Sequence, residues 1–328
     1  MWAVGQTEDP GQLTLIEHWN GKAWRQVTSP NPGSNKLNDV SPSWAVGSYN
    51  SSGTKTLVLR RVGNSWAWVT SPNPETNLNE LQGVVQISPD NGWAAGYVLN
   101  GTAYRTLILH WNGTAWKRVQ SPNTGAASTD NMLFGIAAHG ADDLWAVGQQ
   151  EEGPGTQPLT LHWNGAKWKI ASAPTLGDVP FDFFLVDVDI DSMHAWAVGS
   201  YAVGSSLKGS ILRRDGTKWK RVQLPSFALG TVIDGVKAIS PRNVWAVGEE
   251  STKNLVLHWN GRSWKKVQVQ NPGTVENLLR HRRPVRGRNL DGGGVSQLVG
   301  PRLRGPRAAL LLASCYAADA RVALDASS

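Results

Sequence analysis

The chain has 328 residues, of which 40% are hydrophobic and 17% charged, with 35 Gly and 18 Pro. This composition excludes a disordered chain, and no apolar run approaches the roughly 18 residues of a membrane-spanning helix. The formal net charge is +7, but residues 1–275 hold 23 Lys and Arg against 21 Asp and Glu, whereas residues 276–328 hold nine Arg against four acids. We therefore divide the chain into a nearly neutral body, 1–275, for which nucleic-acid binding is not expected, and an Arg/Gly/Ala-rich tail, 276–328.

Tryptophan marks an internal repeat. The chain has 17 Trp against five Phe and five Tyr, so Trp must occupy equivalent places. The sequence Trp-Ala-Val-Gly, or a near copy, recurs every 42 to 52 residues. Its first residues, which we call the opening Trp, are Trp2, Trp44, Trp93, Trp145, Trp196 and Trp245. A repeat of about fifty residues predicts a modular fold of stacked units.

Each repeat is predicted to contain four short strands. In the fourth copy these are 134–138, 144–149, 158–163 and 167–172. Between the last two strands lies Asn164-Gly165, a preferred pair for a two-residue hairpin turn because both positions need positive φ. One such sheet cannot bury both faces alone, and radial stacking buries them against neighbours. The predicted fold is therefore all-β: a β-propeller of about six four-stranded blades, of which the first is incomplete. If this chain derives from a longer intact protein, that protein could have seven or more blades.

The repeat resembles known propeller families. Its Trp-Ala-Val-Gly strand and its Trp-Asn-Gly-x-x-Trp hairpin are similar to kelch-type blades, and Asp215-Gly216-Thr217-Lys218-Trp219 is similar to the Asp-box turn of sialidase-like propellers. The chain departs from both patterns, because single glycines such as Gly47 and Gly148 stand where kelch repeats have a pair, and one copy alone has the Asp-box Asp. The resemblance implies a kelch-like or Asp-box-like bacterial propeller that is secreted or carried at the cell surface.

The start of the chain suggests a shortened first repeat. Met1 directly precedes Trp2, where other copies have Leu144 or Val244. One hypothesis is that an internal GTG codon for Val was taken as the initiator, so that upstream sequence with a secretion signal is lost. We expect an extracellular or cell-surface location, although this chain carries no signal peptide.

The tail departs from the repeat. After Asn277-Leu278-Leu279 the chain reads Arg-His-Arg-Arg-Pro at 280–284, where copy four has Gly-Ile-Ala-Ala at 135–138. Codons for the basic stretch, read one base later, can encode Gly-Ile-Ala-Ala, so we suspect a frameshift near Arg280 and a tail that is non-native or disordered. In that case the ring of blades lacks a strand that would close it on the first repeat, and the shifted reading frame would have encoded this strand. The alternative is a genuine basic arm that binds nucleic acid or anionic lipid.

Two further sets of repeat positions carry aromatic residues. The closing Trp of the hairpin recurs in every copy, which with the opening Trp predicts packing between blades. Its members are Trp24, Trp66, Trp116, Trp168, Trp219 and Trp264. A middle position, just before the hairpin turn, alternates between Trp and Arg, which predicts flat side chains that are partly solvated. These side chains could stack on a sugar or an aromatic ligand or, alternatively, on the neighbouring strand. Its members are Trp19, Arg61, Trp111, Trp163, Arg214 and Trp259.

Metal sites have weak support in the sequence. Four histidines precede middle-position Trp residues in separate repeats, so we expect them to be dispersed and not to converge on zinc. They are His18, His110, His162 and His258. Asp187, Asp189 and Asp191 form Asp-x-Asp-x-Asp on a predicted strand, where three carboxylates on one face would favour a cation such as Ca²⁺. No other cofactor is expected.

Enzyme motifs are not found in the sequence. The body has no Cys, and neither a nucleophile elbow, a P-loop nor a dinucleotide fingerprint occurs. The connections after each Trp-Ala-Val-Gly and those between repeats vary in length and charge, as binding loops do. We therefore predict a non-catalytic, monomeric scaffold that binds a protein or glycan through its loop face. The alternatives are a sialidase-like glycan-active enzyme and a truncated gene product without a function of its own.

Overall fold

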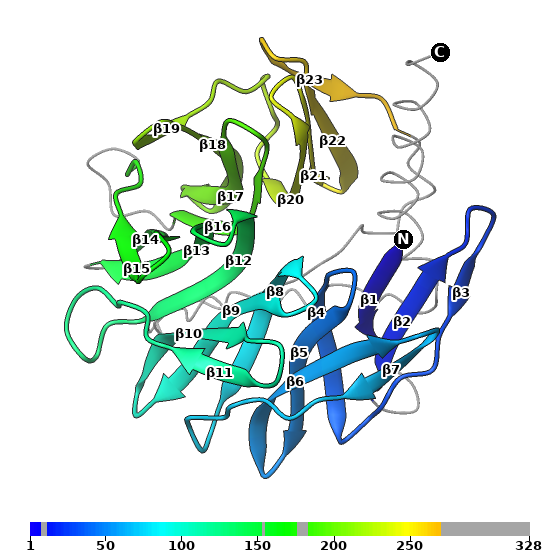
Figure 1. The fold of residues 1–328 in the computed structure, drawn as a ribbon. Helices are drawn as coiled ribbons and strands as arrows, with labels where there is room; N and C mark the ends of the chain where they lie inside the picture. The colour runs from blue at the N-terminus through cyan, green and yellow to red at the C-terminus, as the bar shows by residue number, and fades with distance from the viewer. Residues whose placement is uncertain (8–11, 153–154, 176–182, 270–328) are drawn as a thin grey trace.

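The computed structural model describes residues 1–7, 12–152, 155–175 and 183–269, and the predicted tail lies outside these residues. The described elements are 23 β-strands in six antiparallel sheets, which follow one another around a centre as the blades of a propeller (Figure 1). No described residue belongs to a helix that could span a membrane. The predicted β-propeller is confirmed.

The blades follow the order of the chain. Blade 1 contains β1 (Trp2–Gln6), β2 (Thr14–Trp19) and β3 (Trp24–Gln26). Blade 2 contains β4 (Ser34–Val40), β5 (Trp44–Ser51), β6 (Gly53–Val62) and β7 (Ser65–Trp68). Blade 3 contains β8 (Asn79–Ser88), β9 (Asn91–Asn100), β10 (Ala103–Trp111) and β11 (Trp116–Val119). Blade 4 contains β12 (Asn131–Gly140), β13 (Asp143–Glu152), β14 (Gly155–Trp163) and β15 (Trp168–Ala171). Blade 5 contains β16 (Phe183–Ile190), β17 (Ala195–Val203), β18 (Ser206–Asp215) and β19 (Lys218–Arg221). Blade 6 contains β20 (Thr231–Ser240), β21 (Asn243–Glu250), β22 (Lys253–Trp259) and β23 (Trp264–Val267).

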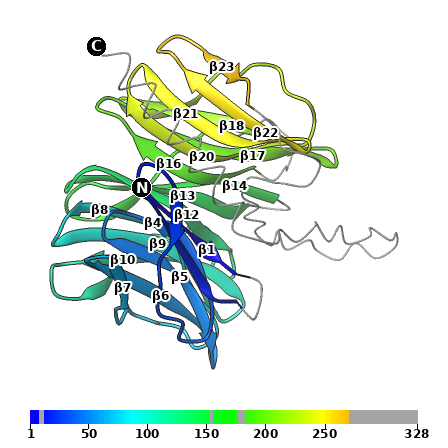
Figure 2. The same ribbon diagram turned by 90° about the vertical axis from the view of Figure 1, so that its right-hand side faces the viewer.

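Every complete blade runs from an inner first strand to an outer fourth strand, and the chain then enters the inner strand of the next blade. Seen from the side, the sheets form successive layers from the blue blades to the yellow blade (Figure 2). Blade 1 has three strands among the described residues, as the sequence predicted, and β1 corresponds to the second strand of the others. Neighbouring blades pack closely from blade 1 to blade 6, whereas the described parts of blades 6 and 1 share no comparable contact.

The glycine of Trp-Ala-Val-Gly is required by the inner strand. A Cβ on Gly47 would overlap the carbonyl oxygen of Lys36 and lie 2.8 Å from the Cα of Leu37. The glycines at the same position of blades 3 to 6 meet the same obstacle, namely Gly96, Gly148, Gly199 and Gly248. The side chain is absent because the two backbones approach too closely for a Cβ.

The opening Trp of one blade packs against the closing Trp of the next. Ring centroids lie between 5.0 and 5.8 Å apart and the rings cross at 74° to 89°, an edge-to-face geometry that aromatic quadrupoles favour. The pairs are Trp2–Trp66, Trp44–Trp116, Trp93–Trp168, Trp145–Trp219 and Trp196–Trp264. Five blade junctions therefore share one aromatic contact.

Candidate functional site

The Trp residues of the middle position lie at blade junctions. Trp111 is 4% exposed, and its ring packs on the opening Trp44 of the preceding blade with centroids 4.8 Å apart. Its indole N–H donates to the carbonyl oxygen of Pro89 at 3.2 Å. Trp163 and Trp259 make the equivalent contacts, with Trp93 and Trp196 respectively. The expectation of partial solvation is wrong for Trp111 and Trp259, because the neighbouring blade buries them.

Arginine at the middle position makes the same contact through its charge. The Arg214 guanidinium carbon lies 4.4 Å from the ring centroid of Trp145, and that of Arg61 lies 5.6 Å from Trp2. In these blades a planar cation covers the opening Trp, where the other blades place the ring of a second Trp. This equivalence explains the alternation of Trp and Arg at the middle position. Trp19 packs at 5.7 Å on Trp24 of its own blade. The faces that were expected to receive a ligand are thus turned toward protein aromatic rings.

The histidines stack within their own blades. His162 lies on Trp145 with ring centroids 4.4 Å apart, and its Nε2 lies 2.8 Å from Asp143 Oδ1. His110 repeats the arrangement with Trp93 and Asn91, and burial lowers its pKa. The described residues contain no group of three or more His, Cys, Asp or Glu that could hold a metal ion.

Two of the three aspartates of the Asp-x-Asp-x-Asp motif connect blade 5 to blade 6. Asp187 Oδ2 accepts a hydrogen bond from the backbone N–H of Val236 at 2.9 Å. Asp189 Oδ2 accepts one from Ala238 N–H at 2.9 Å and lies 2.8 Å from Lys237 Nζ. These carboxylates therefore already have donors on the next inner strand.

Asp191 is separated from the other two by its local bonds. Its Oδ1 accepts the backbone N–H groups of Met193 and His194 at 2.7 and 2.9 Å. Its Oδ2 accepts the indole N–H of Trp196 at 2.8 Å. The structure does not bring the three carboxylates together, and Asp191 instead fixes the turn that leads into β17.

Sequence reasoning missed Asp39, which is the counterpart of Asp187 in blade 2. Both residues stand at the same irregularity of the inner strand, where blades 3, 4 and 6 have Gly83, Gly135 and Gly235. Burial raises the pKa of Asp39 to about 6 and that of Asp187 to about 7. The two carboxylates also act on each other, because inner strands of different blades face a common centre. The signal in the sequence was Asp at a position that otherwise holds Gly.

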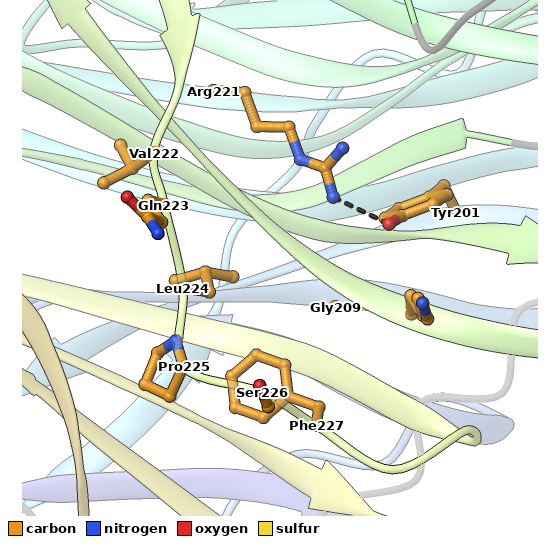
Figure 3. Close-up of a pocket in the computed structure, with 10 residues that line it drawn as sticks. Tyr201, Gly209, Arg221, Val222, Gln223, Leu224, Pro225, Ser226 and Phe227 are labelled. Atoms are coloured by element: carbon orange, nitrogen blue, oxygen red, sulfur yellow. Dashed lines mark hydrogen bonds between the residues drawn. The ribbon is translucent and has the colours of Figure 1, made fainter.

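A cavity lies at the edge of blade 5 that faces blade 6. It has a volume of about 520 Å³. Its lining comes from the β17–β18 hairpin, from Arg221 at the end of β19, and from residues 222–227 of the connection to β20. Figure 3 shows this connection running from Arg221 to Phe227, with Tyr201 and Gly209 facing it from the hairpin strands. Both kinds of variable connection therefore contribute to this blade-5 cavity.

Blade 5 lacks a set of polar contacts that blades 1 to 3 share, which we call the polar staple. In blade 3, the backbone N–H of Thr106 donates to Asn123 Oδ1 at 2.9 Å, and the Thr106 and Ser121 hydroxyl oxygens lie 2.8 Å apart. Blades 1 and 2 repeat it with Thr14, Ser29 and Asn31, and with Thr56, Ser71 and Asn73. The corresponding residues of blade 5 are Gly209, Leu224 and Ser226. In blade 5 these three residues line the cavity.

Cationic and aromatic side chains line the blade-5 cavity. Arg221 donates a hydrogen bond to the Tyr201 hydroxyl at 2.7 Å, and its guanidinium carbon lies 4.7 Å from the centroid of the same ring. Lys208 stands opposite Tyr201 in the β17–β18 ladder. Phe227 supplies a second ring, over which Lys266 places its Nζ at 5.1 Å. The lining includes two cations and no carboxylate, which suits a ligand with negative charge.

The combination of residues at the positions of Tyr201 and Arg221 differs from blade to blade while the strands around them repeat. They lie two residues after the glycine of Trp-Ala-Val-Gly and two residues after the closing Trp. Blade 2 has Tyr49 packed against Trp68 at 5.4 Å, and blade 6 has Glu250 paired with Lys266 at 2.8 Å. Blade 1 has Thr7 and Gln26, which line a second cavity of about 320 Å³. Comparing the repeats at these two positions would have pointed to the cavities.

Comparison with known proteins supports the fold. No family model matches the chain, and no curated protein matches it. Among solved structures, it is similar to a polysaccharide lyase, described as an ulvan lyase of family PL25 bound to -[GlcA(1-4)Rha3S]-, with a TM-score of 0.51 and 10% identity over 84% of this chain and 82% of that chain. It also resembles YCF48 bound to D1 peptide, with a TM-score of 0.46 and 12% identity over 81% of this chain and 85% of that one. For YCF48 from Cyanidioschyzon merolae the TM-score is 0.45 and the identity 17%, over 78% of this chain and 79% of that chain. At these identities the likeness concerns the fold.

Proposed function

We propose that the chain is a non-catalytic propeller scaffold that binds an acidic glycan in the blade-5 cavity. The observation that carries this proposal is the lining: two cations and two aromatic rings stand around about 520 Å³, with no carboxylate among the lining residues. In keeping with the sequence resemblance, we assign the chain to kelch-like or Asp-box-like propellers of bacterial type that act as monomers outside the cell or at its surface.

The chemistry of the cavity fits a charged sugar better than a neutral one. Arg221 has a planar guanidinium that can bind a carboxylate or sulfate through two N–H groups, and Lys208 adds a point charge nearby. The rings of Tyr201 and Phe227 offer apolar faces against which the C–H side of a sugar can pack. A few polar groups beside apolar surface are the usual composition of a ligand site.

The same lining argues for binding without reaction. Hydrolysis of a glycosidic bond by general acid–base catalysis uses a pair of carboxylic groups that flank it. The cavity offers neither a carboxylate nor an imidazole, and the Tyr201 hydroxyl is held by Arg221. Specificity would then reside in two connections carried on rigid strands.

The test is a binding panel with the full chain. Polysaccharides that carry uronic acid or sulfate groups are compared with neutral polysaccharides by affinity gel electrophoresis, and new reducing ends are measured in the same samples. We expect retardation by acidic polymers, little by neutral ones, and no new reducing ends. Equal retardation by neutral polymers, or none by any, would contradict the proposal, and released ends would identify an enzyme.

A further inference from the structure

Trp68 differs from every other tryptophan of the chain. The other 16 belong to the opening, closing and middle positions of the repeat, whereas Trp68 stands two residues after the closing Trp66, at the end of the outer strand β7. Trp68 is 49% exposed, and each of the other 16 is buried or half-buried. Packing between blades therefore accounts for the other tryptophans and gives no reason for Trp68.

The position of Trp68 faces solvent in all six blades. The other residues at this position are Gln26, Arg118, Ile170, Arg221 and Lys266, and all of them are exposed. Most of them are polar or charged, as is usual on a solvated strand, and the large apolar surface of tryptophan is costly to leave in water. Exposed tryptophan and tyrosine are instead typical of binding surfaces, so Trp68 indicates a contact outside the chain.

Tyr49 holds the ring of Trp68 in place. The two ring centroids lie 5.4 Å apart and the rings cross at 79°, an edge-to-face contact that leaves Trp68 half exposed. In the β6–β7 ladder, Trp68 pairs with Leu59. Beyond it, the backbone N–H of Val69 donates to the carbonyl oxygen of Val58 at 2.9 Å. Both the ring and its backbone are therefore fixed before any ligand arrives.

A lysine beside the tyrosine repeats an arrangement of the blade-5 cavity. Lys55 stands opposite Tyr49 in the β5–β6 ladder. In blade 5, Lys208 stands opposite Tyr201 in the same way. The corresponding pairs of the other complete blades, which contain no tyrosine, are Val98–Arg105, Gln150–Gln157 and Glu250–Lys253. Blade 2 thus shares the tyrosine and the lysine of the cavity, and it has Trp68 where the cavity has Arg221.

The three residues Tyr49, Lys55 and Trp68, which we call the blade-2 platform, adjoin a connection that is bonded in place. The polar staple of blade 2 fixes the chain that follows Trp68. The Lys55 ammonium donates to the carbonyl oxygen of Thr76 in the same connection, at 3.2 Å. Binding to a surface that is already fixed loses little conformational entropy, which favours affinity.

We propose that the blade-2 platform is a second contact site for the acidic glycan, in which the C–H face of a sugar ring packs on Trp68 and Lys55 supplies a positive charge. This inference rests on the proposed function, because the ligand is the same. The two sites differ in what they recognise. Arg221 binds the acidic group itself, whereas an indole packs against the apolar face that charged and neutral sugars share.

The two sites stand on opposite blades of the ring. Blades 2 and 5 lie across the centre from each other (Figure 1), and both sites are built on the same strands of their blades, so they share one face of the propeller. A polymer of repeating sugar units can contact both sites, through one chain or through two. Each site then raises the apparent affinity of the other for the polymer.

The test is affinity electrophoresis of the full chain with dextran sulfate and with polygalacturonate, which carry sulfate and carboxylate groups respectively. Trp68→Ala should weaken the Kd for a polymer that retards the wild type by about fivefold, and Trp68→Phe, which keeps a ring, should recover most of that loss. Ile170→Ala is the matched control, because Ile170 is 46% exposed at the same repeat position of blade 4. Its Kd should equal that of the wild type.

Fluorescence quenching by acrylamide reports on Trp68 directly, because this is the tryptophan that solvent reaches most. Free wild-type chain should be quenched more than Trp68→Phe, and saturating polymer should remove most of the difference. A Trp68 that acrylamide does not reach in the free chain, or that it still reaches at saturation, would overturn the inference.

Arg221→Gln separates this inference from the proposed function. Weaker binding by Arg221→Gln with unchanged binding by Trp68→Ala overturns the platform and supports the cavity. The reverse result supports the platform and overturns the cavity. Equal losses in Trp68→Ala and Ile170→Ala also overturn the platform, since any exposed apolar residue of an outer strand would then serve. If neither polymer retards the wild type, both proposals are wrong.

Discussion

The carboxylate of Asp39 on the inner strand of blade 2 accepts a hydrogen bond from the backbone N–H of Val84 on the inner strand of blade 3, at 2.8 Å. Asp187 bridges blades 5 and 6 in the same way, through Val236 N–H at 2.9 Å. Where the position holds glycine, as at Gly83 and Gly135, the next inner strand approaches so closely that a Cβ would lie 3.1 Å or less from its backbone. Neighbouring blades are thus joined at the centre either by a carboxylate or by direct backbone packing.

Removing one of these bridges should destabilise the fold. Asp187→Ala leaves the N–H of Val236 without its acceptor, which costs about 1–3 kcal/mol for a buried donor. Denaturant unfolding of the variant and the wild type measures the loss. Lys237→Ala is the matched control, because its ammonium is more than half exposed and its pairing with Asp189 should contribute little.

The same carboxylates predict how stability depends on pH. The folded pKa values, about 6 for Asp39 and about 7 for Asp187, lie above the ordinary value of 3.8, so the folded state binds protons more tightly between about pH 4 and 7. The free energy of unfolding contributed by these groups therefore rises as the pH falls from 7 toward 4. Asp187→Asn should flatten this dependence, measured by denaturant titration at several pH values. A steeper dependence in the variant would contradict the assignment.

The opening Trp should be among the costliest residues to truncate. Trp196 is fully buried between Trp259 and Trp264 of the next blade, and Trp196→Ala should cost about 3–5 kcal/mol. Trp68 is 49% exposed, so Trp68→Ala should cost well under half as much. Thermal unfolding of both variants gives the comparison, and equal losses would argue against packing between blades as the role of the opening Trp.

The middle position should accept either a ring or a guanidinium. Arg214→Trp keeps a flat group over Trp145 and should leave the Tm within a few degrees of the wild type, whereas Arg214→Glu removes the cation and should lower it clearly. Thermal unfolding distinguishes the two variants. Similar losses in both would show that Arg214 has a role other than covering Trp145.

The repeat made the fold predictable, because equivalent residues in one chain reveal which positions packing constrains. Trp-Ala-Val-Gly predicted the second strand of each blade. The predicted two-residue turn at Asn164-Gly165 is wrong, because Trp163 pairs with Trp168 across four residues and Gly165 alone of the two has a positive φ. The environment of Trp111 could not be predicted in this way, since alternation with Arg is compatible both with solvent exposure and with a cation over a ring. Asp187 was similarly ambiguous, because its partner Val236 N–H belongs to a different blade and backbone donors leave no mark in the sequence.

The loops that form the cavity could be predicted from the sequence, but the contacts among its lining residues could not. Variable connections pointed to one set of loops, and the structure adds that Gly209 and Leu224 line the cavity at positions where blades 1 to 3 have staple residues. The contact between Arg221 and Tyr201 depends on two strands that flank a third, so their separation in sequence hides it.

The most direct test of the proposed binding function is a calorimetric titration with one acidic polysaccharide, chosen because it retards the wild-type chain in gel electrophoresis. The polysaccharide is titrated into the wild-type chain and into two variants. Arg221→Gln removes the cation that is bonded to Tyr201 in the cavity, and Arg118→Gln changes the residue at the same repeat position of blade 3, which does not line the cavity. We predict at least a tenfold weaker Kd for Arg221→Gln, equivalent to about 1.4 kcal/mol, and an unchanged Kd for Arg118→Gln. Equal affinities for all three proteins would contradict the account.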